Sequence, residues 1–223
     1  MRGYVIQSNR IEKANKIITI LEESLRKPIK DLTILDIGTG NGEIANYIAG
    51  KNNHVYSVDV QKLVDDKKCS FQFIQVKDER LPFADNFFDI LISNHVIEHL
   101  EKGMRHLNEI NRVVKPRGGC YFATPNRNFP WEVHTRTLLI HYFPYQAFWR
   151  ILKHLHRYQE PIYLMRYGEM KKAFLQAGFT YEDFTMKVIN YPERYHMGTS
   201  CKIEFPAFLA KFSPTNIFFL KKL

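Results

Sequence analysis

The sequence predicts an α/β fold in which a doubly wound, mainly parallel sheet carries helices on both faces. Short apolar segments alternate with longer segments of helical periodicity. Residues 87–93, "FFDILIS", have the apolar density of a buried parallel strand. A glycine-rich loop at residues 38–42 follows an early strand and precedes a helix. The 223 residues are 45% hydrophobic, which is enough for one domain around a single core.

The predicted elements follow one another in chain order. The expected strands are 32–38, 54–60, 70–76, 87–93, 120–124, 181–188 and 215–220. The expected helices are 9–26, 41–50, 94–114 and 167–178. The third helix has an apolar stripe formed by Val96, Leu100, Met104, Leu107, Asn111 and Val114.

The alternation breaks after Pro125, where aromatic residues, His and Arg accumulate. We therefore predict a single domain, residues 1–223, with an aromatic and basic insertion after the fifth strand. Its parts would be a ligand-binding core at 27–125, a lid insertion at 126–162, and a C-terminal helix with closing strands at 163–223.

The composition indicates which compartment and which partners to expect for the protein. No basic segment followed by a long apolar run starts the chain, and no apolar run is long enough to span a bilayer. Three separated cysteines without a CxxC pair favour a reducing cytoplasm. The net charge is +9, of which residues 125–223 contribute +7. This basic half could face nucleic acid, an anionic membrane or a phosphorylated substrate, or it could be a solvated surface.

The stretch "ILDIGTGNGEIA", residues 34–45, predicts a ligand-binding loop. Gly38, Gly40 and Gly42 allow a tight turn and a close approach of ligand to backbone. A dinucleotide loop would read G-x-G-x-x-G, but position 43 is Glu. The Asp36 carboxylate just before the loop would repel a pyrophosphate, so a ligand with a cationic end fits better.

A second carboxylate, Asp59, falls at the end of the second predicted strand. A carboxylate at that position can accept hydrogen bonds from both hydroxyls of a ribose. The alternative is that Asp59 caps a helix starting in the following "QKLVDD".

Four stretches in the correct order resemble the motifs of class I S-adenosylmethionine-dependent methyltransferases. They are "ILDIGTGNGEIA", "VYSVDV", "RLPFADNFFDILISNHVIEHL" and "EINRVVKPRGGCYFATPN". "HVIEHL" in particular is similar to ubiquinone-pathway members of that family, which act on small molecules. The resemblance implies a Rossmann-like fold with a seven-stranded sheet. It also implies S-adenosylmethionine as cofactor and S-adenosylhomocysteine as product.

The same resemblance implies which residues hold the cofactor. Asp36 would complement its sulfonium and ammonium groups, Asp59 its ribose, and an acid near "LPF" its adenine. The commonest position of that acid is Lys77 here, which leaves Asp78 or Glu79. The residues assigned in this way are Asp36, Gly38, Thr39, Gly40, Asn41, Gly42, Asp59, Val60, Gln61, Asp78, Glu79 and Asn94.

Several methyltransferase classes do not fit. After the fourth strand the chain reads Asn94-His95-Val96-Ile97, and not the Asn/Asp-Pro-Pro-aromatic motif of enzymes that methylate amino groups of bases. No Cys-Pro nucleophile is present for cytosine C5 chemistry. His95 and His99 sit at i and i+4 of the predicted helix, with His106 close to the same helical line. Two such histidines could hold zinc, but no third acidic or thiolate ligand is placed nearby in sequence, so we expect no metal.

A general base for a hydroxyl acceptor is expected in the insertion. His134 is the first candidate, with Glu132 or His141 as alternative bases or as groups that orient it. His95, at the start of the third predicted helix, lies nearer the pocket. The aromatic insertion could equally be a structural cap whose side chains only pack.

These observations predict methyl transfer to a small or lipid-linked acceptor, with O-methylation expected. The enzyme would be cytoplasmic with peripheral membrane contact, and we expect no nucleic-acid partner. The basic C-terminal half keeps an RNA methyltransferase open as an alternative. A non-catalytic, cofactor-binding regulator is the third reading.

Overall fold

The computed structural model describes residues 2–132, 137–139, 142–154, 161–198 and 204–223. Its strands are β1 (Thr33–Ile37), β2 (His54–Asp59), β3 (Gln72–Gln75), β4 (Phe88–Asn94), β5 (Val114–Pro125), β6 (Trp131–Glu132), β7 (Thr137–Leu138), β8 (Phe179–Asp183) and β9 (Thr215–Lys222). Its α-helices are α1 (Arg2–Leu25), α2 (Glu43–Ala49), α3 (Gly103–Val113), α4 (Tyr145–His154), α5 (Tyr167–Gln176) and α6 (Thr185–Asn190). Short 3₁₀ helices are η1 (Asp66–Lys68), η2 (Ile97–His99) and η4 (Ala207–Phe212).

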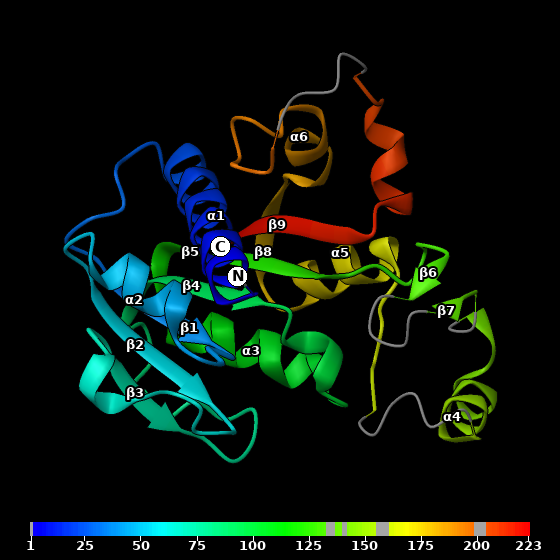
Figure 1. Cartoon of the computed structure of the whole chain (residues 1–223), viewed down its shortest axis with the longest axis horizontal. Coiled ribbons are helices and arrows are strands. Elements are labelled where there is room, and N and C mark those ends of the chain that lie inside the picture. Colours follow the sequence, from blue (N-terminus) through cyan, green and yellow to red (C-terminus); the bar gives the residue numbers. More distant parts are fainter. Residues whose placement is uncertain (1, 133–136, 140–141, 155–160, 199–203) are drawn as a thin grey trace.

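Seven strands form one sheet in the order β3-β2-β1-β4-β5-β9-β8 (Figure 1). Strands β1 to β5 are parallel, whereas β9 runs antiparallel to both β5 and β8. The chain leaves β1 toward β2 on one side and returns to β4 on the other, which creates a switch point between β1 and β4. The predicted α/β, Rossmann-like, mainly parallel seven-stranded sheet is confirmed.

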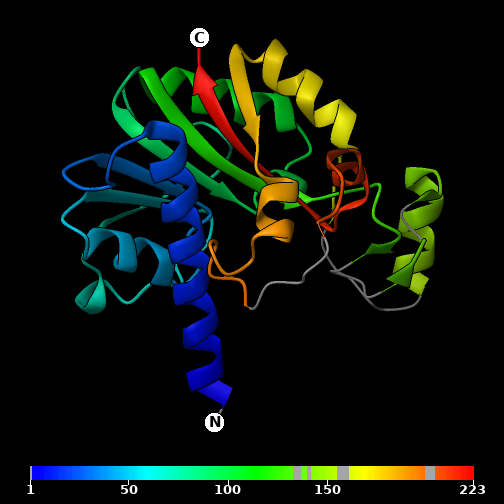
Figure 2. The ribbon, with the colours of Figure 1, turned by 90° about the horizontal axis from the view of Figure 1, so that it is seen from above.

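Helices cover both faces of this sheet (Figure 2). Alternate residues of β1 point to opposite faces, so Ile34 joins the core beneath α1, α2 and α6, while Leu35 joins the core beneath α3 and α5. Both side chains are fully buried. Because each face has its own apolar core, the sheet is held rigidly between two helical layers, and its carboxyl edge is a firm base for a site.

The first helix is longer than its apolar spacing predicted, since α1 begins at Arg2 and not near residue 9. Ala14, Ile18 and Leu21 are buried as expected, but Ile11 is largely exposed. The buried side chains face α2 and the neighbouring strands, which anchors the C-terminal half of α1 on the sheet.

The helix predicted at 94–114 was wrong in its first nine residues. The backbone of His95 has a φ of 60°, and η2 follows at Ile97–His99, so α3 begins only at Gly103. The buried face of α3 is formed by His106, Leu107, Ile110 and Val113, whereas Met104 is exposed. The three histidines of this segment therefore do not share a helical line, because only His106 belongs to α3.

The closing strands also differ from their predicted bounds. Gly178, at a φ of 80°, ends the turn after α5, and β8 starts at once with Phe179. The strand ends at Asp183, so the second half of the predicted strand 181–188 is the helix α6 instead.

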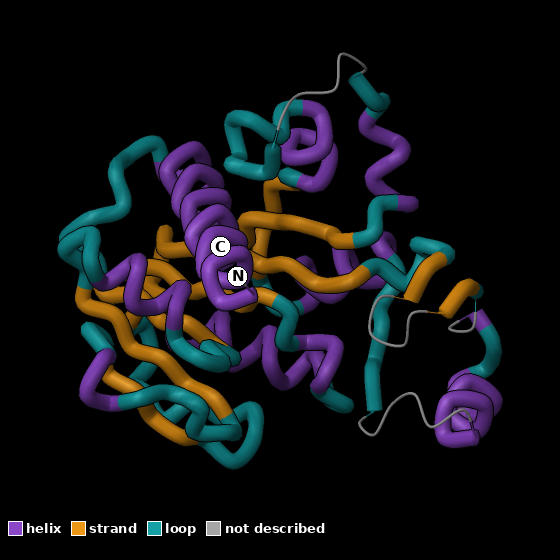
Figure 3. The backbone as a smooth tube through the Cα atoms, in the orientation of Figure 1, coloured by secondary structure: helices purple, strands orange, loops and turns teal. Residues whose placement is uncertain are grey.

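The insertion after β5 contributes β6, β7 and α4, which lie beside the main sheet and outside it (Figure 3). In the part of the chain that the structure describes, no helix combines the length and the apolar composition needed to cross a membrane.

Candidate active site

The glycine loop lies where β1 ends, next to the switch point of the sheet. Gly38, Gly40 and Gly42 have φ values of 72°, 57° and 79°, a region that favours glycine. A Cβ added at Gly38 would lie 2.6 Å from Cγ2 of Val96. One added at Gly42 would lie 2.6 Å from Cζ of Phe71. One added at Gly40 would have no atom of the described residues within 4 Å, apart from its own chain neighbours. The loop is therefore packed at two glycines and open at the middle one, where a ligand can approach the backbone.

Asp59, the last residue of β2, is tied to this loop. Its Oδ2 accepts a hydrogen bond of 2.8 Å from the Gly40 N–H, and its Oδ1 accepts one of 3.0 Å from the Gln61 N–H. These two bonds fix the carboxylate plane, and each oxygen keeps acceptor capacity for a further donor. The alternative role as a helix cap is not what the structure shows, because the residues after Asp59 form no α-helix.

A pocket of about 270 Å³ opens beside the loop. Six of the predicted site residues line it, namely Gly38, Asp59, Val60, Asp78, Glu79 and His95. Its other walls are mostly apolar, with two further imidazoles from His99 and His106. Apolar walls with carboxylates among them suit a nucleoside, whose base needs apolar faces and whose sugar needs hydrogen-bond acceptors.

The other predicted cofactor residues do not line this pocket; they are Asp36, Thr39, Gly40, Asn41, Gly42, Gln61 and Asn94. Asn41 is exposed, and its Nδ2 donates to Oε1 of Glu43 at 2.9 Å. Asn94 is half-buried at the end of β4, and Thr39 is buried inside the loop. Five of these residues belong to β1 and the glycine loop, so they lie beside the pocket without lining it.

Asp36, which lies in β1 two residues before Gly38, is 4% exposed. Burial raises the pKa of this carboxyl to about 7, the neighbouring Asp59 carboxylate adds to the rise, and the Thr39 hydroxyl and the Arg10 guanidinium oppose it. A buried carboxylate with a raised pKa gains most from a cationic partner, because such a partner compensates for the lost hydration.

Arg10 is a site residue that the sequence analysis missed. It extends from α1 toward the loop, where its Nε lies 4.0 Å from Oε2 of Glu43, and it acts electrostatically on Asp36. In the sequence, Arg10 is one of several charged residues of an amphipathic helix, which does not distinguish a ligand contact from a solvated surface.

The segment after β4 places a second group of polar residues at the pocket. His95 Nδ1 lies 3.1 Å from Oε1 of Glu98, a fully buried carboxylate whose Oε2 accepts a 2.9 Å hydrogen bond from the Thr124 hydroxyl. Neither Glu98 nor Thr124 is among the site residues predicted from the sequence. The spacing of Glu98 three residues after His95 was visible, but the assumed helix concealed the local turn that brings the two together.

The three histidines near the pocket have different environments. His106 is buried and hydrogen-bonded to the Ser93 hydroxyl at 2.9 Å, and burial lowers its pKa to about 4. His95 pairs with Glu98 and is partly exposed. Among the described residues, no group of three or more His, Cys, Asp or Glu side chains is arranged to hold a metal ion.

Of the four catalytic candidates, only His95 can be placed in the site. His134 and His141 lie outside the described residues, and for Glu132 the structure describes only a backbone position in β6. The insertion does border a second, apolar pocket of about 230 Å³, with walls that include Phe143, Phe148 and Ile162. Tyr163, which lines this second pocket, links it to the segment after β4, because its N–H donates to the Glu98 carbonyl at 2.7 Å.

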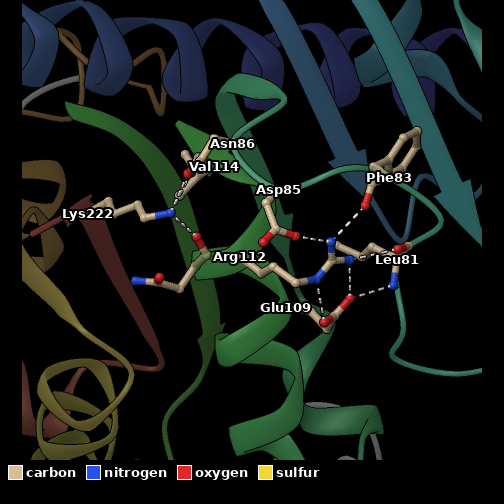
Figure 4. Close-up of polar contacts among 9 residues, drawn as sticks. Leu81, Phe83, Asp85, Asn86, Glu109, Arg112, Val114 and Lys222 are labelled. Carbon is tan, nitrogen blue, oxygen red and sulfur yellow. Dashed lines mark hydrogen bonds and ion pairs between the residues drawn. The ribbon is translucent and has the colours of Figure 1, made fainter. Parts of the chain in front are cut away.

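Hydrogen bonds and ion pairs around Arg112 hold one wall of the pocket beside the glycine loop, which we call the nucleoside pocket (Figure 4). The Arg112 guanidinium, on α3, donates to the carbonyls of Leu81 and Phe83 and pairs with Asp85 and Glu109 at 2.9 and 2.7 Å. Glu109 in turn accepts from the Leu81 N–H at 2.9 Å. Leu81 lines the pocket, so these contacts fix one wall of the pocket to α3.

Comparisons with known proteins agree with this geometry. Residues 35–122 match the family described as "Methyltransferase domain". A ubiquinone biosynthesis O-methyltransferase of Rickettsia conorii is 28% identical over 113 residues, covering 47% of this chain and 39% of that protein. The ubiquinone/menaquinone biosynthesis C-methyltransferase UbiE of Coxiella burnetii is 31% identical over 98 residues, covering 38% of this chain and 39% of that protein. The chain thus spans less than half the length of these two curated relatives.

A solved structure extends the similarity over nearly the whole fold. The 1,6-didemethyltoxoflavin-N1-methyltransferase of Burkholderia thailandensis, with bound S-adenosylhomocysteine, has a TM-score of 0.57 at 15% identity. The alignment covers 95% of this chain and 79% of that one. The matched domain includes the glycine loop, Asp59 and the His95–Glu98 segment. Residues 35–122 of the chain are therefore similar to a methyltransferase domain, and the fold of the chain is that of solved methyltransferases.

Proposed function

We propose that this protein transfers the methyl group of S-adenosylmethionine to a small or lipid-linked acceptor, and that the accepting atom is a hydroxyl oxygen. The observation that carries the proposal is the oriented Asp59 carboxylate beside a glycine loop that is open at Gly40, with a nucleoside-sized pocket adjoining both. Relatives of the matched domain include both O- and C-methyltransferases, so the acceptor atom needs its own test.

The residues present fit such a cofactor. Asp59 would accept hydrogen bonds from the ribose hydroxyls, and Asp78 or Glu79 would accept one from the adenine amino group. Asp36 supplies negative charge for the ammonium and sulfonium groups, and Arg10 supplies positive charge for the carboxylate. The loop would thus present side chains of both signs to a ligand that carries both charges, whereas the Asp36 and Asp59 carboxylates would repel a pyrophosphate.

The chemistry that this cofactor supplies is an electrophilic methyl group. The protein must align the acceptor oxygen behind that methyl carbon, exclude water and accept the hydroxyl proton. The oxygen forms a bond to the carbon as the carbon–sulfur bond breaks, and that electron pair stays on the sulfur. Of the residues proposed for the proton, His95 lies in the described pocket, whereas His134, Glu132 and His141 belong to the insertion.

The second, apolar pocket supports an acceptor with an apolar part. It lies between the insertion and residues 162–165, and Tyr163 connects it to the Glu98 backbone. An aromatic ring or prenyl chain would bury apolar surface there, while its hydroxyl faces the cofactor side. Such acceptors are often membrane-bound, which fits a cytoplasmic protein with a peripheral membrane contact.

Calorimetry tests the cofactor first. S-Adenosylhomocysteine should bind and NAD should not, and Asp59→Ala should weaken binding by about 1.5–3 kcal/mol because two charge-assisted hydrogen bonds are lost. Glu169→Gln, at the exposed start of α5, is the matched control that removes one carboxylate without touching the pocket. Tight NAD binding without a response to S-adenosylhomocysteine would overturn the proposal.

A screen of acceptors tests the second part of the proposal, the nature of the acceptor. Transfer of a labelled methyl group should be followed to catechol, a prenylated catechol, glucose and a polyprenyl alcohol, with the phenols expected to react. Transfer to total RNA would favour the alternative based on the basic C-terminal half, provided that RNA binding weakens steeply with salt. Cofactor binding without transfer to any of these acceptors would favour a regulatory role.

A further inference from the structure

The Glu98 side chain is completely buried although it carries a carboxylate. Burial of a charge is costly unless hydrogen bonds and an opposite charge compensate for it. The compensation here comes from the Thr124 hydroxyl at 2.9 Å on Oε2 and from His95 Nδ1 at 3.1 Å on Oε1. The backbone of Glu98 is held as well, because its carbonyl accepts the Tyr163 N–H at 2.7 Å. Both the carboxylate and its backbone are therefore fixed in place.

His95 connects this buried carboxylate to the pocket. Its side chain is 41% exposed and lines the nucleoside pocket together with Gly38 and Asp59. Its backbone has a φ of 60°, which is unusual for a residue with a Cβ, and its N–H donates to the Ala123 carbonyl at 2.8 Å. Such conformations persist where surrounding contacts enforce them, and they gather at functional sites. Since Nδ1 faces Glu98, the second ring nitrogen, Nε2, remains for the pocket.

We infer that Glu98 is a positioning residue that holds His95 with Nδ1–H toward the carboxylate, so that Nε2 accepts the proton of the acceptor hydroxyl. This inference rests on the proposed methyl transfer. The O–H bond breaks, its proton moves to Nε2, the oxygen bonds to the methyl carbon, and the carbon–sulfur bond breaks with its electron pair left on sulfur. The imidazolium that forms lies against the Glu98 carboxylate, which stabilises it.

The neighbouring imidazole cannot take this role. His106 is buried, hydrogen-bonded to Ser93, and kept neutral by its lowered pKa, so it is a poor proton acceptor. Other ionisable groups face the same pocket and act on His95 from outside the pair; they are Asp59, Asp78, Glu79, His99 and His106. A variant confined to Glu98 leaves all five unchanged, which separates its contribution from theirs.

The tautomer of His95 can be measured without a substrate. In protein labelled with ¹⁵N-histidine and loaded with S-adenosylhomocysteine at pH 8.5, long-range ¹H–¹⁵N spectra should show His95 as the Nδ1–H tautomer. Free histidine prefers the opposite tautomer, so this signature reports the Glu98 contact. Glu98→Leu should lose it, whereas Glu98→Gln should keep it, because the amide oxygen still accepts. His95 observed as the Nε2–H tautomer in the wild type would overturn the inference, because Nε2 could then accept no proton.

Turnover with the acceptor that reacts best in the screen provides the second test. His95→Gln should lower turnover roughly 10²–10⁴-fold and remove the acidic limb of the pH–rate profile. Glu98→Gln should lower turnover less and move that limb to lower pH, because the imidazolium loses its carboxylate partner. In the His95→Gln background, Glu98→Gln should have no further effect. An additive loss, or an acidic limb that survives His95→Gln, would show that the pair only stabilises the fold.

Controls separate this inference from the proposed function. His54→Gln, at the opposite end of β2, should leave turnover and the pH profile unchanged. Melting temperature should change little in His95→Gln, because the Gln amide can still donate to the Glu98 carboxylate, and S-adenosylhomocysteine should still bind. If Glu98→Gln does not fold, His95→Gln alone decides the question. Failure of wild-type protein to bind S-adenosylhomocysteine would instead count against the proposed function itself.

Discussion

At the scale of single residues, Asp36 shows how a cofactor site can reduce stability. Its folded pKa of about 7 lies above the ordinary value of 3.8, because burial disfavours the charged form. The folded state therefore binds more protons than the unfolded state between these values, and stability falls as pH rises from about 4 to 7. A residue that costs stability at neutral pH needs another reason to be present, and a cationic ligand supplies one.

The first prediction concerns this residue without ligand. Asp36→Asn should raise the melting temperature at pH 8 by roughly 3–6 °C and change it little at pH 4.5, because only the charged form is penalised. Thermal melts of both proteins across pH 4.5–8.5 provide the measurement. An equal shift at all pH values would mean that Asp36 is not the titrating group.

Cofactor affinity provides the second prediction. Only ionised Asp36 attracts the cationic end, so S-adenosylmethionine should bind more tightly as pH rises toward 7 and level off above it. One proton limits the slope to about tenfold per pH unit. Calorimetry in buffers of different ionisation enthalpy should also detect proton release on binding below pH 7. In Asp36→Asn both the slope and the release should vanish while overall affinity falls; a slope that persists would assign the proton to another group.

Metal independence is the third prediction. Within the described residues, the carboxylates and imidazoles near β4 are paired with one another or separated, and none forms a three-ligand group. Turnover should therefore be unchanged by excess EDTA. Activity lost on chelation and restored by added zinc or magnesium would show that a metal binds through residues other than those considered.

At the scale of elements, the loop at 81–85 depends on α3 for its position. Arg112 contributes two hydrogen bonds to carbonyls of this loop and two ion pairs, and Asp85 and Glu109 raise its pKa further above an already high value. The guanidinium therefore stays charged at any accessible pH. It acts as a clamp between the helix and a wall of the nucleoside pocket.

The fourth prediction follows from this clamp. Arg112→Ala should lower the free energy of unfolding by about 2 kcal/mol, because two loop carbonyls and two carboxylates lose a charged donor. S-Adenosylhomocysteine affinity should also fall severalfold, since Leu81 and its neighbours lose their fixed position. Denaturant titration and calorimetry check the two effects. Arg105→Ala is the control, because it removes an equal charge from an exposed position of the same helix. Equal losses of stability and affinity in this control would mean that the change in net charge, and not the loss of the Arg112 contacts, causes them.

The same elements show where sequence patterns succeed and fail. The β4 strand was predictable because a run such as "ILIS" must be buried on both faces. The start of α3 was not, because Val96 and Leu100 continue a helical spacing that the backbone does not follow. The positive φ at His95 is set by the Ala123 carbonyl, a contact 28 residues away in sequence. Local periodicity carries no information about such a contact.

For the candidate site, motifs identified the backbone features, and tertiary packing added the rest. The glycines and Asp59 were predictable because a tight loop and a ribose demand particular residue types at particular spacing. Arg10 was not, because α1 reaches the loop only after packing across α2 and the sheet. Glu98 was missed for the related reason that its significance lies in complete burial, which the sequence does not reveal.

At the scale of the whole molecule, charge and exposed apolar residues coincide in the C-terminal part. The insertion exposes Trp131, Leu138, Leu139 and Phe143, and η4 exposes Phe208 and Phe212. These two regions are joined, because the Asn126 side chain donates to the carbonyls of Lys211 and Ser213. Exposed basic residues accompany them on α4, including Arg150 and Lys153, and residues 125–223 carry a net charge of +7.

The fifth prediction is that this surface binds anionic membranes. Aromatic and basic side chains together favour the interface of a bilayer with acidic lipids, and each basic residue near the surface contributes roughly 1 kcal/mol. The protein should therefore sediment with vesicles of phosphatidylglycerol and phosphatidylcholine, but not with phosphatidylcholine alone, and salt should release it.

Arg150→Glu combined with Lys153→Glu should weaken binding at least tenfold. Lys67→Glu with Lys68→Glu, on η1 at the opposite end of the sheet, should weaken it far less. Equal losses in both double variants would assign the binding to overall charge, and undiminished binding of the α4 variant would exclude α4 from the membrane-binding surface. Wild-type protein that does not sediment with the anionic vesicles would remove the membrane contact from the proposed function.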